Sequence, residues 1–263
     1  YNWTGFLPSN TAVDVVLNMS FNLSNAAHQF RAFTTLPNGT IDGNLTNDEA
    51  ANEFLSLESQ NIPFADAFNN PTIANSWLVV NPDNNITWQT ANVNGCTVNG
   101  NRSAYMNCRN YEGTDADIGL TDFMYLKLNL SNYADANLNF SVSYVPYSYS
   151  IDDRLKVVIS TDCGNTFYDI YDKAGSDLMT GNSPQTTAWS PFSCAFWRTE
   201  NINLSEFAFN EVIIGFVGMS SHGNNIYVDN VAIDGTEFIS CAKPINIEVS
   251  NITETSANFS WLS

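Results

Sequence analysis

The sequence is poor in charge, and above all in basic residues. Lys and Arg total 9 against 27 Asp and Glu, so the formal net charge is −18 although charged residues make up only 14% of the chain. An acidic surface repels phosphate backbones, and nucleic-acid binding is therefore not expected. The same negative charge suits divalent cations and an extracellular protein.

Long apolar runs are also missing. No stretch approaches the roughly 18 consecutive apolar residues that identify a membrane span, so no transmembrane segment is expected. The chain starts without a signal peptide, in what reads as the middle of a strand. We therefore expect a piece of a longer exported polypeptide that is secreted or held at the cell surface.

The motifs of common hydrolases and nucleotide-binding enzymes are absent. The chain has two histidines and contains no His-Glu-x-x-His, no Gly-x-Ser-x-Gly, no phosphate-binding glycine loop and no Rossmann fingerprint. His222 follows Ser220 and Ser221 in a turn, which permits a Ser/His/Asp arrangement but favours an ordinary exposed turn histidine. We expect no enzyme activity in this chain, although a catalytic domain elsewhere in the full-length protein is compatible with it.

Three residue sets have both a functional and a structural interpretation. Two of the acids in turns could form a carboxylate pair like that of a glycosidase. We expect instead that these acids are simply solvated by water: Glu112, Asp115, Asp117 and Asp122. Asp152 and Asp153 are either a second calcium site or, as favoured, solvated turn acids. Four tryptophans could stack on sugars in a carbohydrate-binding module: Trp77, Trp88, Trp189 and Trp197. At least Trp77, Trp88 and Trp197 are instead expected to lie in the protein core.

The five cysteines form no CxxC and no zinc-type pair. Our prediction is two local disulfides, Cys96–Cys108 and Cys163–Cys194, with Cys241 unpaired or bridged outside this chain. The alternative is that all five are reduced, buried thiols.

Helical periodicity is missing from the middle of the chain, where strand patterns follow one another. Apolar and polar residues alternate over 126–130, 138–144 and 155–159. The segment 211–219 is apolar at both parities, so it should be a central strand covered on both faces. Many strands in one long domain predict an all-β fold, a jelly-roll β-sandwich.

The stretch 224–234 predicts the strand that closes this sandwich. Its apolar residues fall at even positions up to Val228 and at odd positions from Val231 onward. A slip of one residue would turn the apolar set to the wrong face, so a β-bulge is expected near Asp229 and Asn230. Asp229 then either faces solvent or caps a turn, or it serves as a calcium ligand.

The two ends of the chain indicate parts of further domains around a main body at 59–240. Residues 1–58 carry three strand signals, about half of an Ig-like sandwich. These signals are Val13–Leu17, His28–Thr34 and Asn52–Leu57. Residues 241–263 resemble the first strands of a fibronectin type III domain. Neither end is large enough to close a core alone.

An ordered series of short blocks in 59–240 carries a family resemblance. The blocks are Phe64–Asn70 with Trp77, Asn81–Trp88, Asn101–Met106, Leu155–Gly164, Trp197-Arg198 and Asn224–Val231. On these blocks the segment resembles the MAM-like jelly rolls of secreted Bacteroidetes proteins, including the cleaved-adhesin (choice-of-anchor) domains of gingipains. The partial Ig-like segment at 1–58 resembles domains repeated in large exported proteins of the same phylum.

The resemblance implies a structural calcium site. Family members bind calcium where the acid of the first strand, the Asn-x-Ser-Ala strand and the Asp of the closing strand converge. Transferred to this chain, these residues are Asp66, Asn101, Ser103 and Asp229. Calcium takes six to eight oxygens, so backbone carbonyls and water must supply the rest. Asp66 replaces the more usual Glu, and Asn69 stands where the family often has a second acid, so a modest affinity is expected.

The function expected from these features is a non-catalytic extracellular adhesion or spacer module of a large exported cell-surface protein, stabilised by calcium. The resemblance implies export by the type IX secretion machinery, attachment at the cell surface, and a cell-surface glycan or protein as ligand. Two alternatives stay open: an accessory C-terminal region of a secreted pappalysin-like metalloprotease, and a carbohydrate-binding module. Coplanar exposed aromatics in a groove would favour the carbohydrate-binding module.

Overall fold

The computed structural model describes residues 4–6, 8, 11–16, 18, 20–36, 39–41, 43–97, 100–111, 120–239 and 245–262, and for 94–97 and 100 it describes the backbone alone. The chain divides into two compact units, Tyr1–Ser56 and Leu57–Ser263. Among the helices of the described residues, none has the length and hydrophobicity that a membrane crossing requires. The domain boundaries at 58 and 240 remain predictions.

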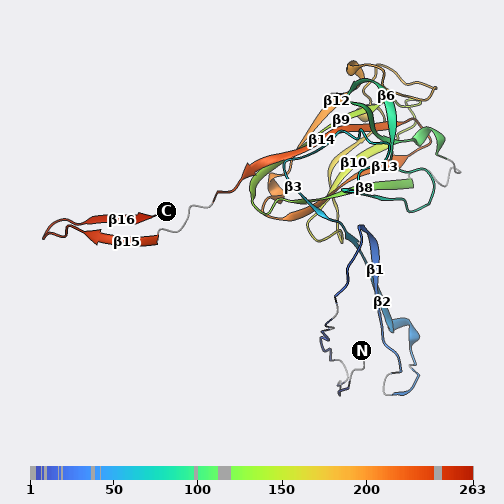
Figure 1. The fold of residues 1–263 in the computed structure, drawn as a ribbon. Helices are drawn as coiled ribbons and strands as arrows, with labels where there is room; N and C mark the ends of the chain where they lie inside the picture. Colours follow the sequence, from blue (N-terminus) through green and yellow to red (C-terminus); the bar gives the residue numbers. More distant parts are fainter. Residues whose placement is uncertain are drawn as a thin grey trace. The chain divides into compact units, whose positions relative to one another are not determined.

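The first unit contains a two-stranded antiparallel sheet (Figure 1). Its strands are β1 (Ala26–Phe33) and β2 (Glu49–Ser56), and the single turn η2 (Leu45–Asn47) precedes β2. Two of the three strand signals are thus confirmed. The strand expected at 13–17 is wrong, because residues 11–16 have no regular structure and Leu17 lies outside the described residues. An apolar run becomes a stable strand only when a neighbour pairs with it, and Val13 and Val16 are exposed.

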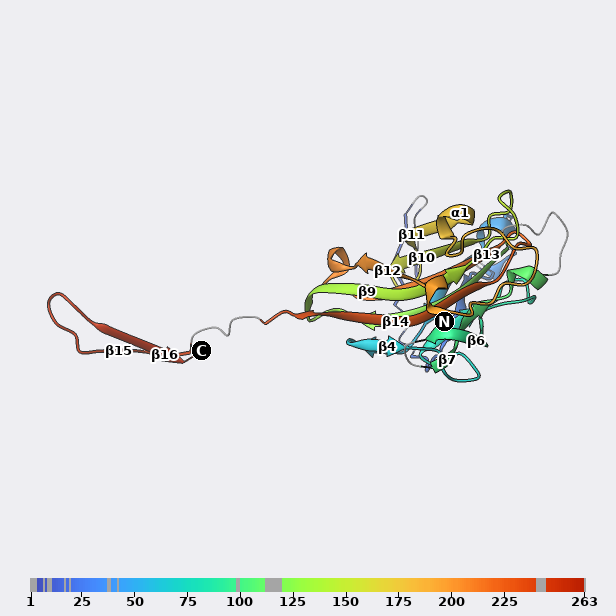
Figure 2. The ribbon, with the colours of Figure 1, turned by 90° about the horizontal axis from the view of Figure 1, so that it is seen from above.

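The second unit is a sandwich of two six-stranded sheets (Figures 1 and 2). The first sheet has the order β11-β10-β13-β8-β3, and β5 also pairs with β8. Its strands are β3 (Ser59–Asn61), β5 (Trp77–Val80), β8 (Leu120–Asn129), β10 (Arg154–Ser160), β11 (Tyr168–Ala174) and β13 (Glu211–Ser220). Except for the parallel pair of β3 and β8, its neighbours are antiparallel.

The second sheet has the order β12-β9-β14-β7-β6, and β4 also pairs with β14. Its strands are β4 (Phe64–Asp66), β6 (Gln89–Thr97), β7 (Gly100–Met106), β9 (Tyr133–Tyr144), β12 (Arg198–Asn203) and β14 (Ile226–Glu237). β9 and β14 run side by side along most of their length (Figure 2). The expected all-β jelly-roll sandwich is confirmed by these two sheets.

The core lies between the sheets because alternate residues of each strand point inward. On β13, Val212, Ile214 and Phe216 belong to this core. The Phe216 ring meets Phe140 of the opposite sheet edge to face, with centroids 5.1 Å apart. Burying a ring of this size stabilises the fold by roughly 1.5–3 kcal/mol. Ile213, which points to the other face of β13, is also buried, so the prediction of a central strand covered on both faces is confirmed.

Helical structure in the described part of this unit is limited to single turns, as the missing helical periodicity indicated. They are η3 (Cys108–Asn110), α1 (Gly175–Leu178), η5 (Cys194–Phe196) and η6 (Ser205–Phe207). Each of them lies between two strands in the order of the chain.

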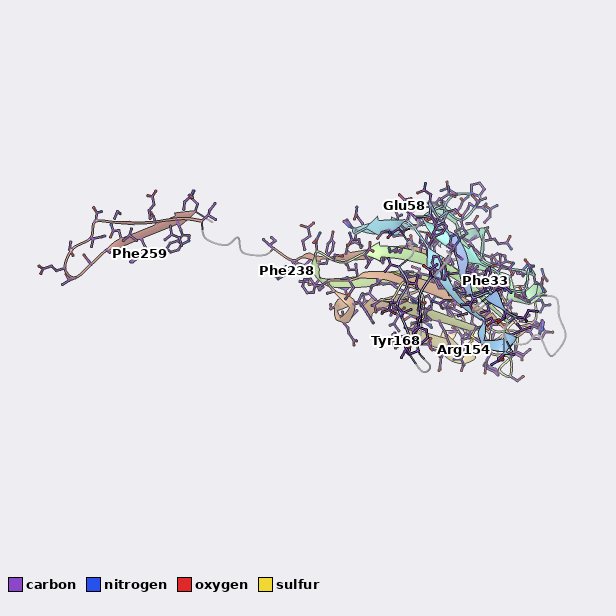
Figure 3. The ribbon with its side chains drawn as sticks, turned by 90° about the horizontal axis from the view of Figure 1, so that it is seen from below. Phe33, Glu58, Arg154, Tyr168, Phe238 and Phe259 are labelled. Carbon is purple, nitrogen blue, oxygen red and sulfur yellow. The ribbon has the colours of Figure 1, made fainter. Side chains whose placement is uncertain are left out.

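The last described segment is a hairpin of β15 (Ile245–Ser250) and β16 (Asn258–Leu262). Every residue of both strands is exposed, and Figure 3, which labels Phe259, shows side chains standing out from it. A two-stranded hairpin by itself is at best marginally stable in water. Its fibronectin type III identity remains a prediction.

The predicted disulfides are wrong. Cys108 is a buried free thiol and Cys163 an exposed one, which excludes both Cys96–Cys108 and Cys163–Cys194. Cys194 is nevertheless disulfide-bonded, so the alternative of five reduced thiols is wrong as well. Cys241 lies outside the described residues. Short sequence spacing favoured local pairs, whereas strand order decides which cysteines meet.

Candidate functional site

The β-bulge expected in the closing strand is present, at a point where the neighbours of β14 change. The register of β14 against β9 shifts between Asp229 and Ala232, and Asn230 has a positive φ of 50°. On its other edge, β14 pairs with β7 up to Val228 and with β4 from Val231 onward. Asp229 and Asn230 therefore lie at a junction of β4, β7 and β14, where the regular ladder is interrupted.

Three buried oxygens at this junction have no hydrogen-bond partner among the described residues. They are Oδ2 of Asp229, Oδ1 of Asn230 and Oγ of Ser103. Ala104 pairs with Val228, so Ser103 lies opposite Asp229 in the same register. Asp229 and Ser103 are both completely buried, and the interpretation of Asp229 as a solvent-facing residue is therefore wrong. We name Asp66, Ser103, Asp229 and Asn230 the junction cluster.

Asp66 brings a second carboxylate to the junction from β4. Its Oδ1 accepts from the Phe68 backbone N–H at 2.7 Å, and its Oδ2 accepts from Trp77 Nε1 at 2.9 Å. Because Asp66 pairs with Val231, its carboxylate is fixed close to the bulge. The loop that follows is tied down where Arg102 Nε and Thr90 Oγ1 donate to the Asn70 carbonyl.

The electrostatics of the junction oppose an ionised Asp229. Burial raises the pKa of this carboxyl to about 7, and the nearby charge of Asp66 adds to the rise, while the Asn230 N–H at 2.7 Å from Oδ1 lowers it. A buried carboxylate with one oxygen unpaired is costly unless a proton or a cation compensates it. Among the described residues, none of the ion pairs involves Asp229.

The junction cluster fits a calcium ion by its donor types. Carboxylate, hydroxyl and amide oxygens are the ligands that Ca²⁺ takes in proteins, and three of these oxygens are buried without another partner. The described residues contain no group of three or more His, Cys, Asp or Glu side chains that could hold a metal. Here two carboxylates are instead supplemented by neutral oxygens, which is compatible with calcium and unsuited to zinc.

The structure brings together three of the four predicted ligands. The fourth, Asn101, is exposed at the beginning of β7, two residues before Ser103. Asn230 was not among the predicted residues, although the predicted bulge pointed to it, since Asn is one of the few residues that adopt positive φ readily. Asn69, at the position of the family's frequent second acid, is exposed.

Asp153 is neither solvated nor free to bind calcium. It is completely buried, and its two carboxylate oxygens accept from the backbone N–H groups of Ser221, Gly223 and Asn224 and from the Tyr144 hydroxyl, at 2.6–3.1 Å. The expectation of a solvated turn acid is therefore wrong: Asp153 fixes the turn before β14. Gly223 is required there, because a Cβ would lie 2.0 Å from Asp153 Oδ2.

His222 does not form a catalytic arrangement. It is half-buried, with its Nδ1 2.9 Å from the Tyr111 carbonyl oxygen, and its Nε2 is buried without a partner among the described residues. The Ser220 hydroxyl donates to the Cys108 carbonyl and Ser221 to that of Asp152. Neither serine contacts the imidazole, so the turn-histidine interpretation holds, although the side chain is less exposed than expected.

The four tryptophans offer no sugar-binding platform. Trp77, Trp88 and Trp189 are buried and Trp197 is half-buried. The turn acids differ from expectation as well, because Asp122 is completely buried. Three acids named with it lie outside the described residues: Glu112, Asp115 and Asp117.

An aromatic stack that the sequence did not single out lies on the outer face of the first sheet. Tyr125 is sandwiched between Phe123 and Phe167, with centroids 5.4 and 5.2 Å apart and planes within 11° and 23° of parallel. The Tyr125 ring lies over Gly215, where a Cβ would come within 2.6 Å of it. Beside the stack is a hollow of about 270 Å³, also lined by Thr121, Lys156, Val158, Asp169, Val217 and Met219.

Solved structures with a related fold include two adhesin domains. The K1 cleaved adhesin domain of Lys-gingipain from Porphyromonas gingivalis W83 is 18% identical and aligns over 66% of this chain and 98% of its own, with a TM-score of 0.47. The K3 domain is 16% identical over 65% of this chain and 97% of its own, with a TM-score of 0.45. The chain is similar to cleaved adhesin domains. The similarity expected from the sequence is thereby confirmed, as one of fold.

The similar solved structures also include carbohydrate-binding modules. The CBM22-1 xylan-binding domain of Paenibacillus barcinonensis Xyn10C is 9% identical and aligns over 70% of this chain and all of its own, with a TM-score of 0.42. No protein-family model and no curated protein matches the chain. The absence of enzyme activity remains a prediction.

Proposed function

We propose that this chain is a non-catalytic extracellular adhesion or spacer module whose sandwich is closed by a calcium ion at the junction cluster. The observation that carries the proposal is the presence of three buried, unpartnered oxygens on residues that the strand register places at the bulge of β14. A cation there would compensate the buried charge of Asp229 and link β4, β7 and β14. Export by the type IX machinery and attachment at the cell surface are the setting implied by the sequence resemblance.

The residues of the junction cluster have distinct roles in this proposal. Asp229 and Asp66 supply negative charge, while Ser103 and Asn230 supply neutral oxygens from positions fixed by the strand register. With few carboxylates the site would bind calcium modestly, which is sufficient in an extracellular setting where such modules work at dissociation constants of about 10⁻⁴–10⁻³ M. The ion would hold shape, and no reaction is assigned to it.

Calcium is expected to raise the melting temperature of the chelator-treated chain. At a free concentration one hundred times Kd, binding to the folded state alone adds about 2.7 kcal/mol of stability. Asp229→Asn should remove most of this gain, and Ser103→Ala should reduce it. Asp234→Asn is the matched control, because Asp234 is an exposed residue of the same strand. The proposal fails if calcium leaves melting unchanged, or if the control loses the gain as fully as Asp229→Asn does.

Glycan binding is a second candidate function, favoured by the aromatic stack and its hollow. Ligand sites combine an apolar floor with a few polar groups, and here Lys156 Nζ and Asp169 Oδ2, 2.7 Å apart, lie at the rim of the hollow. A pyranose ring has the same combination of an apolar face and hydroxyl edges. This function is compatible with adhesion, since a surface glycan would then be the adhesion ligand.

Replacing Phe167 with alanine is expected to weaken binding to a soluble neutral polysaccharide by at least tenfold, equivalent to about 1.4 kcal/mol. Affinity electrophoresis in gels containing xylan or β-glucan measures this change. Phe192→Ala is the control, because Phe192 is an exposed aromatic that packs on Trp189 and does not line the hollow. Wild-type migration unaffected by every polysaccharide, or equal losses in both variants, would argue against a sugar site at the hollow.

A further inference from the structure

A second cluster of unpaired oxygens surrounds Asp122 at the beginning of β8. Asp122 is completely buried, and its Oδ1 has no hydrogen-bond partner among the described residues. The ion pairs of the described part of the chain leave Asp122 without a basic partner. A buried carboxylate in this state needs a compensating proton or cation.

The Tyr111 hydroxyl cannot supply all the compensation. Its oxygen lies 2.6 Å from Asp83 Oδ2 and 2.9 Å from Asp122 Oδ2, yet it carries a single proton. The hydroxyl can donate this proton to only one of the two carboxylates. At the other carboxylate, two acceptor oxygens then face each other without a proton between them. Burial raises the pKa of Asp122 to about 6, hydrogen bonds from Thr87 and Tyr111 lower it, and the charge of Asp83 adds to the rise. The cluster is thus short of positive charge.

Two neutral oxygens converge on the same carboxylate. Val80 of β5 pairs with Phe123 of β8, so the next residue, Asn81, lies opposite Asp122. The Thr87 side chain also lies within hydrogen-bonding reach of the Asp122 carboxyl and lowers its pKa. Asn81 Oδ1 is buried without a hydrogen-bond partner in the described part of the chain, and Thr87 Oγ1 is buried with no partner there besides this carboxyl. A buried carboxylate, an unpaired amide oxygen and a hydroxyl that can still accept therefore lie in one place.

We propose that Asn81, Thr87 and Asp122, with Asp83 beside Tyr111, bind a second divalent cation of the hard, oxygen-preferring class, such as Ca²⁺. The donor set is made of oxygens alone, which excludes a preference for soft metals. The site is separate from the junction cluster, since Asp122 belongs to the first sheet and Asp229 to the second. The ion would tie the turn at 81–87 to the edge of β8.

Calorimetric titration of the chelator-treated chain with Ca²⁺ is expected to show two bound ions. Asp122→Asn should leave one, as should Asp229→Asn, because each substitution weakens a different site. Thr87→Val keeps the shape of the side chain and removes its oxygen, and it should weaken only the Asp122 site by about tenfold. Thr121→Val is its control on the neighbouring position of β8.

Terbium luminescence identifies the site directly. The Trp88 indole donates to the Asp122 carbonyl at 3.2 Å, so terbium bound beside Asp122 should emit on tryptophan excitation. Asp122→Asn should abolish that part of the emission, and Thr87→Val should reduce it at subsaturating terbium. A single ion that Asp229→Asn removes would overturn this inference and leave the junction proposal intact. A single ion that Asp122→Asn removes would do the opposite. Unchanged binding in folded Asp122→Asn and Thr87→Val would overturn the inference.

Discussion

Asp153→Asn is expected to be among the most destabilising single substitutions in this chain, by about 3 kcal/mol or more. The buried carboxylate accepts four hydrogen bonds. An asparagine would direct an N–H₂ group at some of these donors, and each buried donor left unpaired costs about 1–3 kcal/mol. Urea unfolding of the two proteins measures the difference.

The neighbouring acid provides the control for Asp153. Asp152 is exposed, so Asp152→Asn should change the free energy of unfolding by no more than about 0.5 kcal/mol. Equal effects of the two substitutions, or a small effect of Asp153→Asn, would show that the turn before β14 is held in another way.

Without calcium, the second unit is expected to lose stability as the pH rises through about 7. The folded chain holds the Asp229 proton more tightly than the unfolded chain, where the pKa is near its ordinary value of 3.8. A carboxyl with a raised pKa in the folded state contributes its full stability below the unfolded pKa and loses this contribution progressively until the pH has passed the folded pKa. The difference between these pKa values corresponds to about 4 kcal/mol at most.

Melting temperatures in chelator between about pH 5 and pH 8 measure this dependence. The wild-type value should fall across the range, and the fall should be smaller in Asp229→Asn, which cannot titrate at that position. Asp122 titrates in the same direction, so some slope should remain in the variant. Saturating calcium should flatten the wild-type curve, because the cation replaces the proton. Parallel slopes in the two proteins would contradict the assignment of the effect to Asp229.

The parts of the fold that the sequence predicted are those that depend on local periodicity. The change of parity after Val228 was sufficient to predict the bulge, because side chains alternate strictly along a strand. The apolar positions of β13 likewise predicted a strand covered on both faces. Strand 13–17 shows the limit, since the same local signal is present there without a pairing partner among the described residues.

The acids whose environment was predicted wrongly show that local patterns carry no information about long-range contacts. Asp153 was expected in solvent because it follows another acid in a turn. Its backbone donors come from residues 68 to 71 positions away, and only the folded topology brings them together. Asp122 was misjudged for the same reason, since its partner Tyr111 and its neighbour Asn81 lie on other segments.

The aromatic stack could be predicted from the sequence only in part. Phe123 and Tyr125 are two residues apart on β8, so the alternation alone places both on one face of the sheet. Their outward direction follows from the buried Met124 and Leu126, which take the core positions. Phe167, however, precedes β11, which is separated from β8 by β10 and β13 in the sheet order, so its place in the stack could be found only from the structure.

The central claim is that oxygens at the bulge of β14 hold a cation, and a crystal structure grown in calcium tests it most directly. We expect anomalous density for one ion within about 2.3–2.6 Å of Asp229 Oδ2 and Ser103 Oγ, with Asp66 and Asn230 completing the protein ligands. A junction without an ion at saturating calcium, with Asp229 Oδ2 instead bonded to a protein donor or a water, would contradict the claim.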